Sequence, residues 1–326
     1  MKMSLRASDK LEQNNQAQRS RSPVFHAKSL FLFTKSDFKT VFFPQCIFAL
    51  SIAFAKSREA GHSTEQWPVD IIILRLLCMI FWIWIHLLVA DISNQRLPES
   101  ILEDTINKPW RPLPAGRLTP EEALYMLRIT AIVSICASLL LKSYLPSTTL
   151  LTMLWIYNDL EGSSAGPWIR NGLNAIGITC YGWGAATVLL GNHIGETETA
   201  LRNWYVLMAA VIMTTIHAQD FPDIVGDKAR DRKTMPLLYG ETFSRWSMAF
   251  FVTFWSIVSP RFWNVSSWVV YSCSVGLGNI IAVLVVLRWG QRYDESAFRL
   301  WCLWLTGLYL LPIFRGNLFY NWGIGW

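Results

Sequence analysis

The chain has 326 residues, of which 52% are hydrophobic, 14% aromatic and 16% charged, and its mean hydropathy is +0.28. This composition excludes an ordinary pair of soluble domains and predicts an all-α membrane protein that crosses the bilayer several times. The net charge is only +6, and the basic residues gather in the N-terminal segment and between apolar runs. We therefore expect orientation signals and phosphate contacts, not nucleic-acid binding.

The N-terminal segment, residues 1–28, differs in composition from the rest of the chain. It has low hydrophobicity, no periodicity and several basic residues: Lys2, Arg6, Lys10, Arg19, Arg21 and Lys28. We predict a disordered tail, cytosolic by the positive-inside rule, followed by one transmembrane helical domain over residues 29–326. Because the tail lacks the apolar core of a cleavable signal peptide, the first membrane helix is expected to direct insertion, with the endoplasmic reticulum as the default membrane.

Nine apolar runs follow, most of them near the roughly 20 residues that a helix needs to cross a bilayer. They are residues 38–56, 69–91, 122–142, 145–160, 171–191, 201–219, 244–260, 264–288 and 297–315. Nine crossings from a cytosolic N-terminus place the loops after the second and sixth runs, both rich in Lys and Arg, in the cytosol. The same topology places the sequon Asn264-Val265-Ser266 on the lumenal side, so Asn264 is a candidate glycosylation site.

The loop after the second run, residues 91–123, combines acidic and basic side chains. Asp91 and Asn94, three residues apart, present oxygen ligands on one helix face, and Glu103 is a further candidate ligand. The basic residues of the loop stand among prolines that fix the backbone: Lys108, Arg111 and Arg117. The sequence Thr119–Glu122 then predicts a new helix that begins at a capping box, with proline in its first turn.

The segment 219–236, after the sixth run, repeats this combination on the same predicted side. Asp220, Asp223 and Asp227 fall three and four residues apart, so a helix would project all three carboxylates from one face. Basic residues follow at once: Lys228, Arg230, Arg232 and Lys233. Charged groups at the mouth of a membrane helix are costly unless they have a function, and this pattern predicts metal ligands beside phosphate ligands.

Together the two segments predict one kind of chemistry. Mg²⁺ takes oxygen ligands and bridges a few carboxylates to substrate phosphates. A diphosphate leaves carbon only when its developing negative charge is neutralised, which metal ions and Arg or Lys side chains accomplish. Two acidic helix ends rimmed by basic residues therefore predict a site that ionises an organic diphosphate, with the apolar bundle holding its hydrocarbon tail.

The two motifs resemble the UbiA superfamily of intramembrane prenyltransferases. The resemblance rests on DxxDxxxD followed by RKTMP within residues 220–236 and on NKPWRPLPAGR at 107–117, and it extends over about residues 38–315. It implies a bundle of nine helices around a central cavity, in which the two motifs bind Mg²⁺ and a prenyl diphosphate. By position, it implies metal or diphosphate contacts for Asp91, Asn94, Arg111, Asp223, Asp227 and Lys233.

The first motif departs from the family pattern. Asn94 stands where a second Asp is usual, and several residues are inserted before Asn107. The Asn94 amide can still ligate Mg²⁺, and Glu103 or Asp104 is a candidate for the missing carboxylate. The variant motif resembles that of fungal membrane-bound terpene cyclases, which implies cyclisation of farnesyl diphosphate to a sesquiterpene with release of diphosphate.

A third polar segment lies between the fourth and fifth runs. The resemblance implies that it covers the cavity, with Arg170 and Asn174 near the diphosphate; an ordinary polar connection is the alternative. Tyr157 and Tyr181 are our candidates for aromatic side chains that stabilise a carbocation. Membrane aromatics also serve as interface anchors and packing groups, and that alternative stays open.

Two other functions remain open on the sequence. A prenyltransferase would use the same site to pass the prenyl group to an aromatic or other small acceptor. A membrane transporter or lipid-binding protein would bind without turnover, and its polar groups should lie near the middle of the membrane. The expected partners are an isoprenoid diphosphate and membrane lipid, and no obligate protein partner is inferred.

Overall fold

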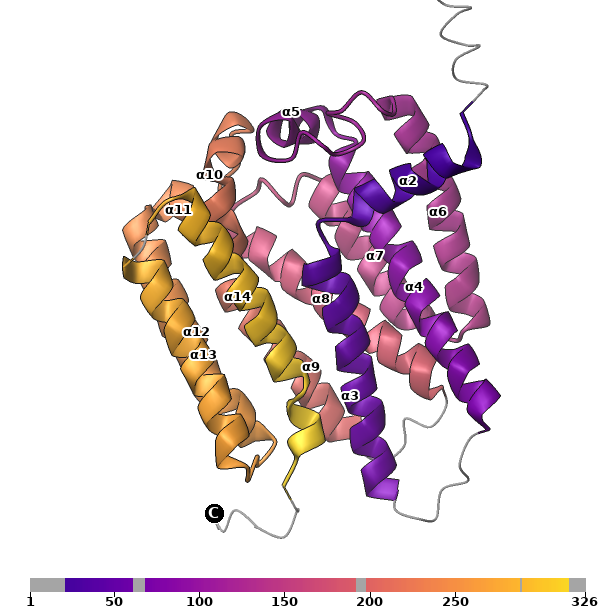
Figure 1. Cartoon of the computed structure of the whole chain (residues 1–326). Coiled ribbons are helices and arrows are strands. Elements are labelled where there is room, and N and C mark those ends of the chain that lie inside the picture. The colour runs from indigo at the N-terminus through magenta and orange to yellow at the C-terminus, as the bar shows by residue number, and fades with distance from the viewer. Residues whose placement is uncertain (1–20, 61–67, 192–197, 288, 317–326) are drawn as a thin grey trace, which may run out of the picture.

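The computed structural model of the chain describes residues 21–60, 68–191, 198–287 and 289–316. Within these ranges every regular element is a helix, which confirms the predicted all-α class. The long helices are α3 (Phe43–Ala60), α4 (Val69–Gln95), α6 (Pro120–Leu140), α7 (Tyr144–Asn158), α8 (Pro167–Leu190), α9 (Glu198–Thr215), α12 (Glu241–Phe262), α13 (Trp268–Leu287) and α14 (Gln291–Tyr309). They lie side by side in a tall bundle (Figure 1).

Each predicted apolar run overlaps one of these long helices. Six stretches of the described chain are long and apolar enough to cross a membrane: Phe38–Arg58, Val69–Gln95, Pro120–Leu140, Pro167–Leu190, Thr199–Ala229 and Trp268–Leu287. Helix α7 has only 15 residues, and α12 and α14 are not among these stretches. A multi-pass membrane bundle is therefore confirmed, whereas the count of nine crossings stays a prediction.

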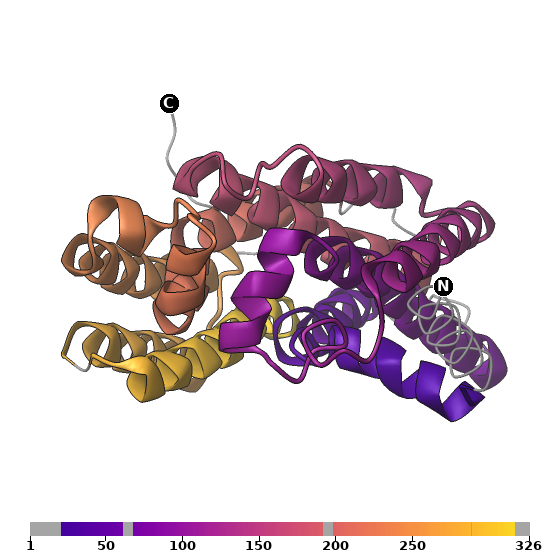
Figure 2. The ribbon, with the colours of Figure 1, turned by 90° about the horizontal axis from the view of Figure 1, so that it is seen from above.

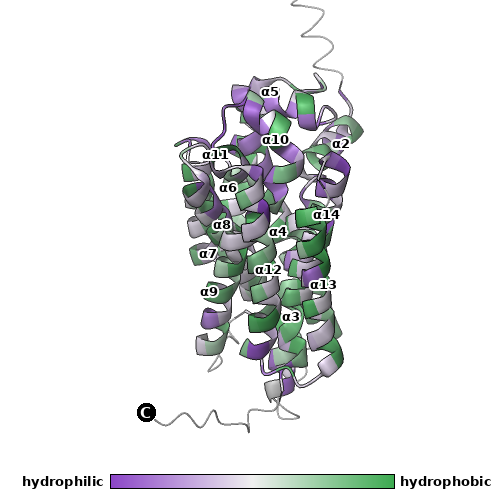
Figure 3. Ribbon diagram, turned by 90° about the vertical axis from the view of Figure 1, so that its left-hand side faces the viewer, coloured by the Kyte–Doolittle hydropathy of each residue, from purple (hydrophilic) through white to green (hydrophobic). Residues whose placement is uncertain are grey.

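Short helices gather at one end of the bundle. They are α2 (Pro23–Thr34), α5 (Pro98–Asn107), α10 (Asp220–Ala229) and α11 (Met235–Tyr239), and α5 crosses over this end when it is seen from above (Figures 1 and 2). Hydrophilic residues concentrate around α5 and α10, whereas the shafts of the long helices are largely hydrophobic (Figure 3). The connection between α12 and α13, which contains the exposed Asn264, lies at the opposite end.

Helix α2 corrects the predicted boundary of the N-terminal tail. The helix begins at Pro23, where the side chain of Ser22 accepts a hydrogen bond from the Phe25 amide, so residues 23–28 are ordered. The guanidinium of Arg117 donates to Ser29 Oγ and to the Phe25 carbonyl, both at 2.8 Å. These tertiary contacts, which local composition does not reveal, fix the helix to the loop after α4. The rest of the predicted tail, residues 1–20, lies outside the described ranges.

The predicted capping box at the start of α6 is confirmed. Thr119 Oγ1 accepts a hydrogen bond from the Glu122 amide at 3.2 Å, and Glu122 Oε2 accepts one from the Thr119 amide at 2.9 Å. Pro120 occupies the first helical position, where a missing N–H costs nothing. The loop between α4 and α6 therefore ends at a fixed point, which helps to position its acidic and basic residues.

Close packing of α4 against α8 forms the wall below the polar end. The Trp82 ring is fully buried, and its Nε1 donates to Ser138 Oγ at 3.1 Å. Helix α8 presents Gly184 to this ring, and a Cβ atom there would lie 2.0 Å from it. His86, one turn along α4, is hydrogen-bonded to Ser147 Oγ at 2.7 Å and joins α4 to α7. The glycine and the two hydrogen bonds let α6, α7 and α8 approach α4 closely.

We expect Gly184→Ala to destabilise the protein by roughly 1–3 kcal/mol, because the added methyl group overpacks the Trp82 ring. Gly172→Ala in the same helix is the matched control, since a Cβ at Gly172 meets nothing within 4 Å. It should be neutral or stabilising, as alanine favours a helix by about 1 kcal/mol over glycine. Thermal unfolding of both variants in detergent measures the difference, and equal shifts would contradict this account of the packing.

Candidate functional site

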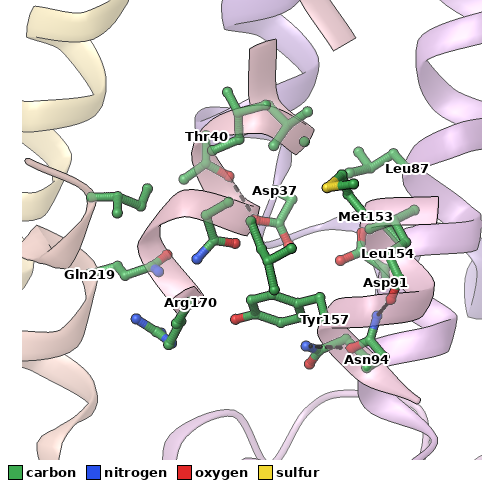
Figure 4. Close-up of a pocket in the computed structure, with 18 of the residues that line it drawn as sticks. Asp37, Thr40, Leu87, Asp91, Asn94, Met153, Leu154, Tyr157, Arg170 and Gln219 are labelled. Carbon is green, nitrogen blue, oxygen red and sulfur yellow. Dashed lines mark hydrogen bonds between the residues drawn. The ribbon is translucent and has the colours of Figure 1, made fainter. Parts of the chain in front are cut away.

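A cavity of about 210 Å³ opens at the end of the bundle that carries α5 and α10. Its walls come mainly from α4, α7 and α8, with contributions from α10, α14 and the π-helical turn η1 (Phe38–Phe42). The structure brings together most of the predicted site residues as its lining: Asp91, Asn94, Glu103, Lys108, Arg111, Tyr157, Arg170, Asn174, Tyr181, Asp223 and Arg232. Figure 4 shows acidic, basic and aromatic side chains converging on the same space.

Most of the remaining lining is apolar: Val41, Leu87, Leu150, Met153, Leu154, Leu173, Ile178, Ile216, Phe298 and Trp301, together with Ala90 and Gly177. Four further lining residues are polar: Asp37, Thr40, Asn158 and Gln219. One cavity therefore carries charged groups on some walls and hydrocarbon and aromatic groups on others. That combination suits a ligand with an anionic head and an apolar tail.

The end of α4 supplies the first acidic group. Because α4 continues to Gln95, Asp91 and Asn94 lie on the same face of the helix, as their spacing predicts. Asp91 is only 7% exposed, and its Oδ2 atom has no hydrogen-bond partner among the described residues. The Asn94 amide nitrogen donates to Asn158 Oδ1 at 3.2 Å, which orients the Asn94 side chain.

Helix α10 supplies the second acidic group, and each of its three aspartates has a cationic partner. The nitrogen–oxygen distances are 2.6 Å for Arg170 and Asp220, 3.3 Å for Lys108 and Asp223, and 2.8 Å for Arg232 and Asp227. Asp220 and Asp227 are buried and do not line the cavity, whereas the partly exposed Asp223 does. The acids and bases that the sequence assigned to metal and phosphate are thus paired with one another.

Glu103 of α5, predicted as a metal ligand, forms ion pairs with two arginines in the structure. Its Oε2 atom lies 3.1 Å from both Arg230 and Arg232, so it joins α5 to the segment after α10. Burial alone would raise the pKa of Glu103, but the two guanidinium charges outweigh burial and lower it. Glu103 therefore stays ionised as a cross-link between the two polar segments.

Asp104, the other candidate for the missing carboxylate, is also engaged. Arg111 Nη1 donates to both of its oxygens, at 2.8 and 3.0 Å. Burial raises the pKa of Asp104 despite the opposing charge of Arg111. This pair holds the basic loop against α5, and a second pair between Arg96 and Asp159 joins the end of α4 to the segment after α7.

Three predicted phosphate contacts lie outside the cavity lining: Arg117, Lys228 and Lys233. Arg117 binds α2, as described above, and the two lysines are exposed. Arg232 lines the cavity, whereas its neighbour Lys233 does not. Asp231 adopts a left-handed conformation (φ 56°), and the Arg232 amide donates a hydrogen bond back to the Asp227 carbonyl at 2.9 Å. Such a chain reversal after a helix depends on backbone geometry, which the sequence motif does not specify.

Sequence reasoning missed Asp37, Thr40 and Gln219, which also line the cavity. Asp37 directly precedes the first predicted membrane run and accepts a hydrogen bond from Thr40 Oγ1 at 2.7 Å. Asp37 and Asp91 line the same cavity, and their carboxyl groups are close enough to interact electrostatically (Figure 4). The signal was present in the sequence, since an acidic residue at the mouth of a membrane helix is as costly here as at Asp91.

The donors around the cavity fit Mg²⁺. In the described ranges no three His, Cys, Asp or Glu side chains are grouped closely enough to hold a metal ion by themselves. The cavity nevertheless offers oxygen donors from Asp91, Asn94 and Asp223, and the buried Oδ2 atom of Asp91 is without a partner there. Mg²⁺ usually keeps water and completes its shell with substrate phosphates, so an incomplete protein ligand set suits an ion that binds together with a diphosphate.

Comparison with known proteins identifies relatives across most of the chain. A model of the UbiA prenyltransferase family matches residues 48–308. The chain is 32% identical over 305 residues to the fumagillin beta-trans-bergamotene synthase of Aspergillus fumigatus, covering 91% of this chain and 96% of that protein. It is 28% identical over 289 residues to the somaliensene A/B synthase of Streptomyces somaliensis, covering 85% of this chain and 89% of that protein.

A solved structure shares the fold. It is a UbiA homolog from Archaeoglobus fulgidus bound to GPP and Mg²⁺, with a TM-score of 0.58 at 13% identity, covering 87% of this chain and 99% of that one.

We expect Glu103→Gln to lower Tm at pH 7, because it removes the charge that Arg230 and Arg232 share. The folded state lowers the pKa of Glu103. The ionised carboxylate therefore stabilises the fold at pH values above the ordinary carboxyl pKa, and this stabilisation is lost as the pH falls through the lowered pKa. The Tm difference from the unaltered protein should therefore shrink below about pH 4. Glu99→Gln, an exposed position on the same helix, is the control and should change Tm little at either pH.

Proposed function

We propose that this chain, which belongs to the UbiA prenyltransferase family, ionises an isoprenoid diphosphate and closes the resulting carbocation into a terpene ring. The observation that carries the proposal is the cavity itself, where paired acidic and basic side chains meet an apolar and aromatic wall. A diphosphate requires the acidic and basic side chains, and a polyprenyl chain requires the apolar and aromatic wall. The similarity to two terpene synthases over 85% or more of the chain supports cyclisation.

The ion pairs suggest how the chain binds the diphosphate. Arg170, Arg232 and Lys108 already lie beside the aspartates of α10, so they are positioned before any ligand arrives. Bound Mg²⁺ would take carboxylate oxygens and neutralise charge on the leaving diphosphate. The same three cations would then turn to phosphate oxygens, where Arg and Lys stabilise developing negative charge.

The apolar wall suggests how the chain handles the hydrocarbon. Tyr157 points into the cavity (Figure 4), and Tyr181, Phe298 and Trp301 complete its aromatic lining. Aromatic faces attract cations, so these rings can stabilise a carbocation while they exclude water that would quench it. We propose farnesyl diphosphate as the substrate and a bergamotene-like sesquiterpene as the product.

One observation supports the runner-up, transfer of the prenyl group to an acceptor. A second cavity of about 460 Å³ shares Asp37, Lys108 and Asp223 with the first, and its lining includes Phe38 and Trp110. An acceptor could bind there beside the ionising carbon. A transporter is less well supported, because the ion pairs join α5, α10 and their neighbouring loops, and these two helices lie at one end of the bundle and not midway along it.

We also propose an orientation and a membrane. The positive-inside rule places the end with α5 and α10 in the cytosol, since the basic residues of both polar segments gather there. The substrate would then reach the cavity from the cytosolic face of the endoplasmic reticulum.

Incubation of purified protein with Mg²⁺ and farnesyl diphosphate alone should release diphosphate and a volatile hydrocarbon. Excess EDTA should abolish both products, and added Mg²⁺ should restore them. Gas chromatography with mass spectrometry detects the hydrocarbon. Absence of a hydrocarbon with every chain length of diphosphate, together with a prenylated product once an acceptor is added, would replace cyclisation by prenyl transfer.

Asp223→Ala should lower turnover by at least about a hundredfold, the scale seen when a preorganised electrostatic group is removed from an active site. The fold should be retained, because Asp223 is partly exposed and makes a single ion pair. Asp70→Asn at the exposed start of α4 is the control and should keep full activity. Turnover by Asp223→Ala equal to that of the control would refute the role of this carboxylate.

A further inference from the structure

The first acidic motif lacks one carboxylate in sequence, and the structure pairs both expected substitutes with arginines. Glu103 is held by Arg230 and Arg232, and Asp104 is held on both oxygens by Arg111. Either residue would have to exchange its arginine partners for a metal ion before it could act as a ligand. A carboxylate that makes no ion pair in the described structure is therefore a better candidate.

Asp37 lies where such a replacement is needed. It lines the cavity together with Asp91, whose Oδ2 atom is buried without a hydrogen-bond partner in the described structure (Figure 4). The two carboxyl groups are close enough to interact electrostatically. Asn94 lines the same cavity one helical turn from Asp91. Two carboxyl groups and an amide oxygen thus face one space from two separate elements, the connection after α2 and the end of α4.

The local backbone holds Asp37 in this position. Asp37 caps the π-helical turn η1, and its carbonyl accepts hydrogen bonds from the amides of Val41, at 2.8 Å, and Phe42, at 3.0 Å. Single π-helical turns are uncommon and often occur at functional sites. The hydrogen bond from Thr40 Oγ1 occupies Asp37 Oδ1, so Oδ1 is anchored while the carboxyl group faces the cavity.

The two cations nearest to these carboxyl groups, Arg111 and Lys108, make their ion pairs with other acids. Arg111 is committed to Asp104, and its Nη2 donates to Ser36 Oγ at 3.2 Å. Lys108 makes its ion pair with Asp223 at 3.3 Å. Two carboxyl groups that line one cavity repel when both are ionised, and a divalent cation that both could bind would offset this repulsion.

We propose that Asp37 is a metal ligand that supplies the missing carboxylate of the first motif, so that Asp37, Asp91 and Asn94 hold one divalent cation together with diphosphate oxygens. The proposal rests on the proposed function, because the ion is expected to bind with the diphosphate. It assigns a functional role to the segment before the first membrane helix, outside both polar loops.

Binding of Mn²⁺, a paramagnetic ion that takes the same oxygen ligands as Mg²⁺, tests the proposal without turnover. Detergent-purified protein is titrated with Mn²⁺ in the presence of inorganic pyrophosphate, and free Mn²⁺ is followed by electron paramagnetic resonance. Asp37→Asn should raise the apparent Kd at least about tenfold, the lower end of what lost metal-site contacts cost. Glu295→Gln is the matched control, because Glu295 lines the neighbouring cavity but pairs with Arg299. It should bind Mn²⁺ like the unaltered protein.

Two further variants separate the outcomes. Thr40→Val keeps the Asp37 carboxylate but removes its anchor, and it should weaken Mn²⁺ binding to a smaller extent even if Asp37→Asn fails to fold. Asp223→Ala tests the proposed function itself. Normal Mn²⁺ binding by folded Asp37→Asn, with weakened binding and lost turnover in Asp223→Ala, would overturn the role of Asp37 alone. Unchanged Mn²⁺ binding in both variants would overturn the metal site of the proposed function as well.

Discussion

Charges at the end of a membrane bundle must be compensated, because burial of a carboxylate or guanidinium without a partner is costly. In this protein the compensation is mutual. The aspartates of α10 pair with cations from α8, from the loop after α4 and from the segment after α10, and Glu103 of α5 pairs with two arginines. The cavity depends on these pairs, since they hold its polar walls together.

The same pairs give the site its proposed chemistry. Each bond between an aspartate and a basic residue can be exchanged for two new ones, a carboxylate bound to metal and a cation bound to phosphate. The buried charges of the site are already paired without a ligand, so binding of a diphosphate with Mg²⁺ would exchange their partners instead of burying new unpaired charges. The pairs of Arg170 with Asp220 and of Arg232 with Asp227 are the most buried examples, and Asp223 is the most accessible.

Sequence patterns predicted features that arise from local spacing. The apolar runs gave the long helices, the capping box gave the start of α6, and the spacing of Asp91 and Asn94 placed both on one helix face. Features that depend on tertiary contacts were not predictable in this way. Arg117, predicted as a phosphate contact, binds α2. Of the predicted contacts Arg232 and Lys233, only Arg232 lines the cavity, because the backbone reverses at Asp231. Asp37 stands at the mouth of the first predicted membrane run, but its proximity to Asp91, which lies far away in sequence, depends on the tertiary structure.

A structure with Mg²⁺ and a non-ionisable thio analogue of farnesyl diphosphate tests partner exchange most directly. The account predicts metal density on Asp91 and Asp223, phosphate oxygens within hydrogen-bond distance of Arg170 and Arg232, and the prenyl chain against Tyr157 and Trp301. Ion pairs of α10 that remain closed, with the diphosphate bound elsewhere, would contradict it.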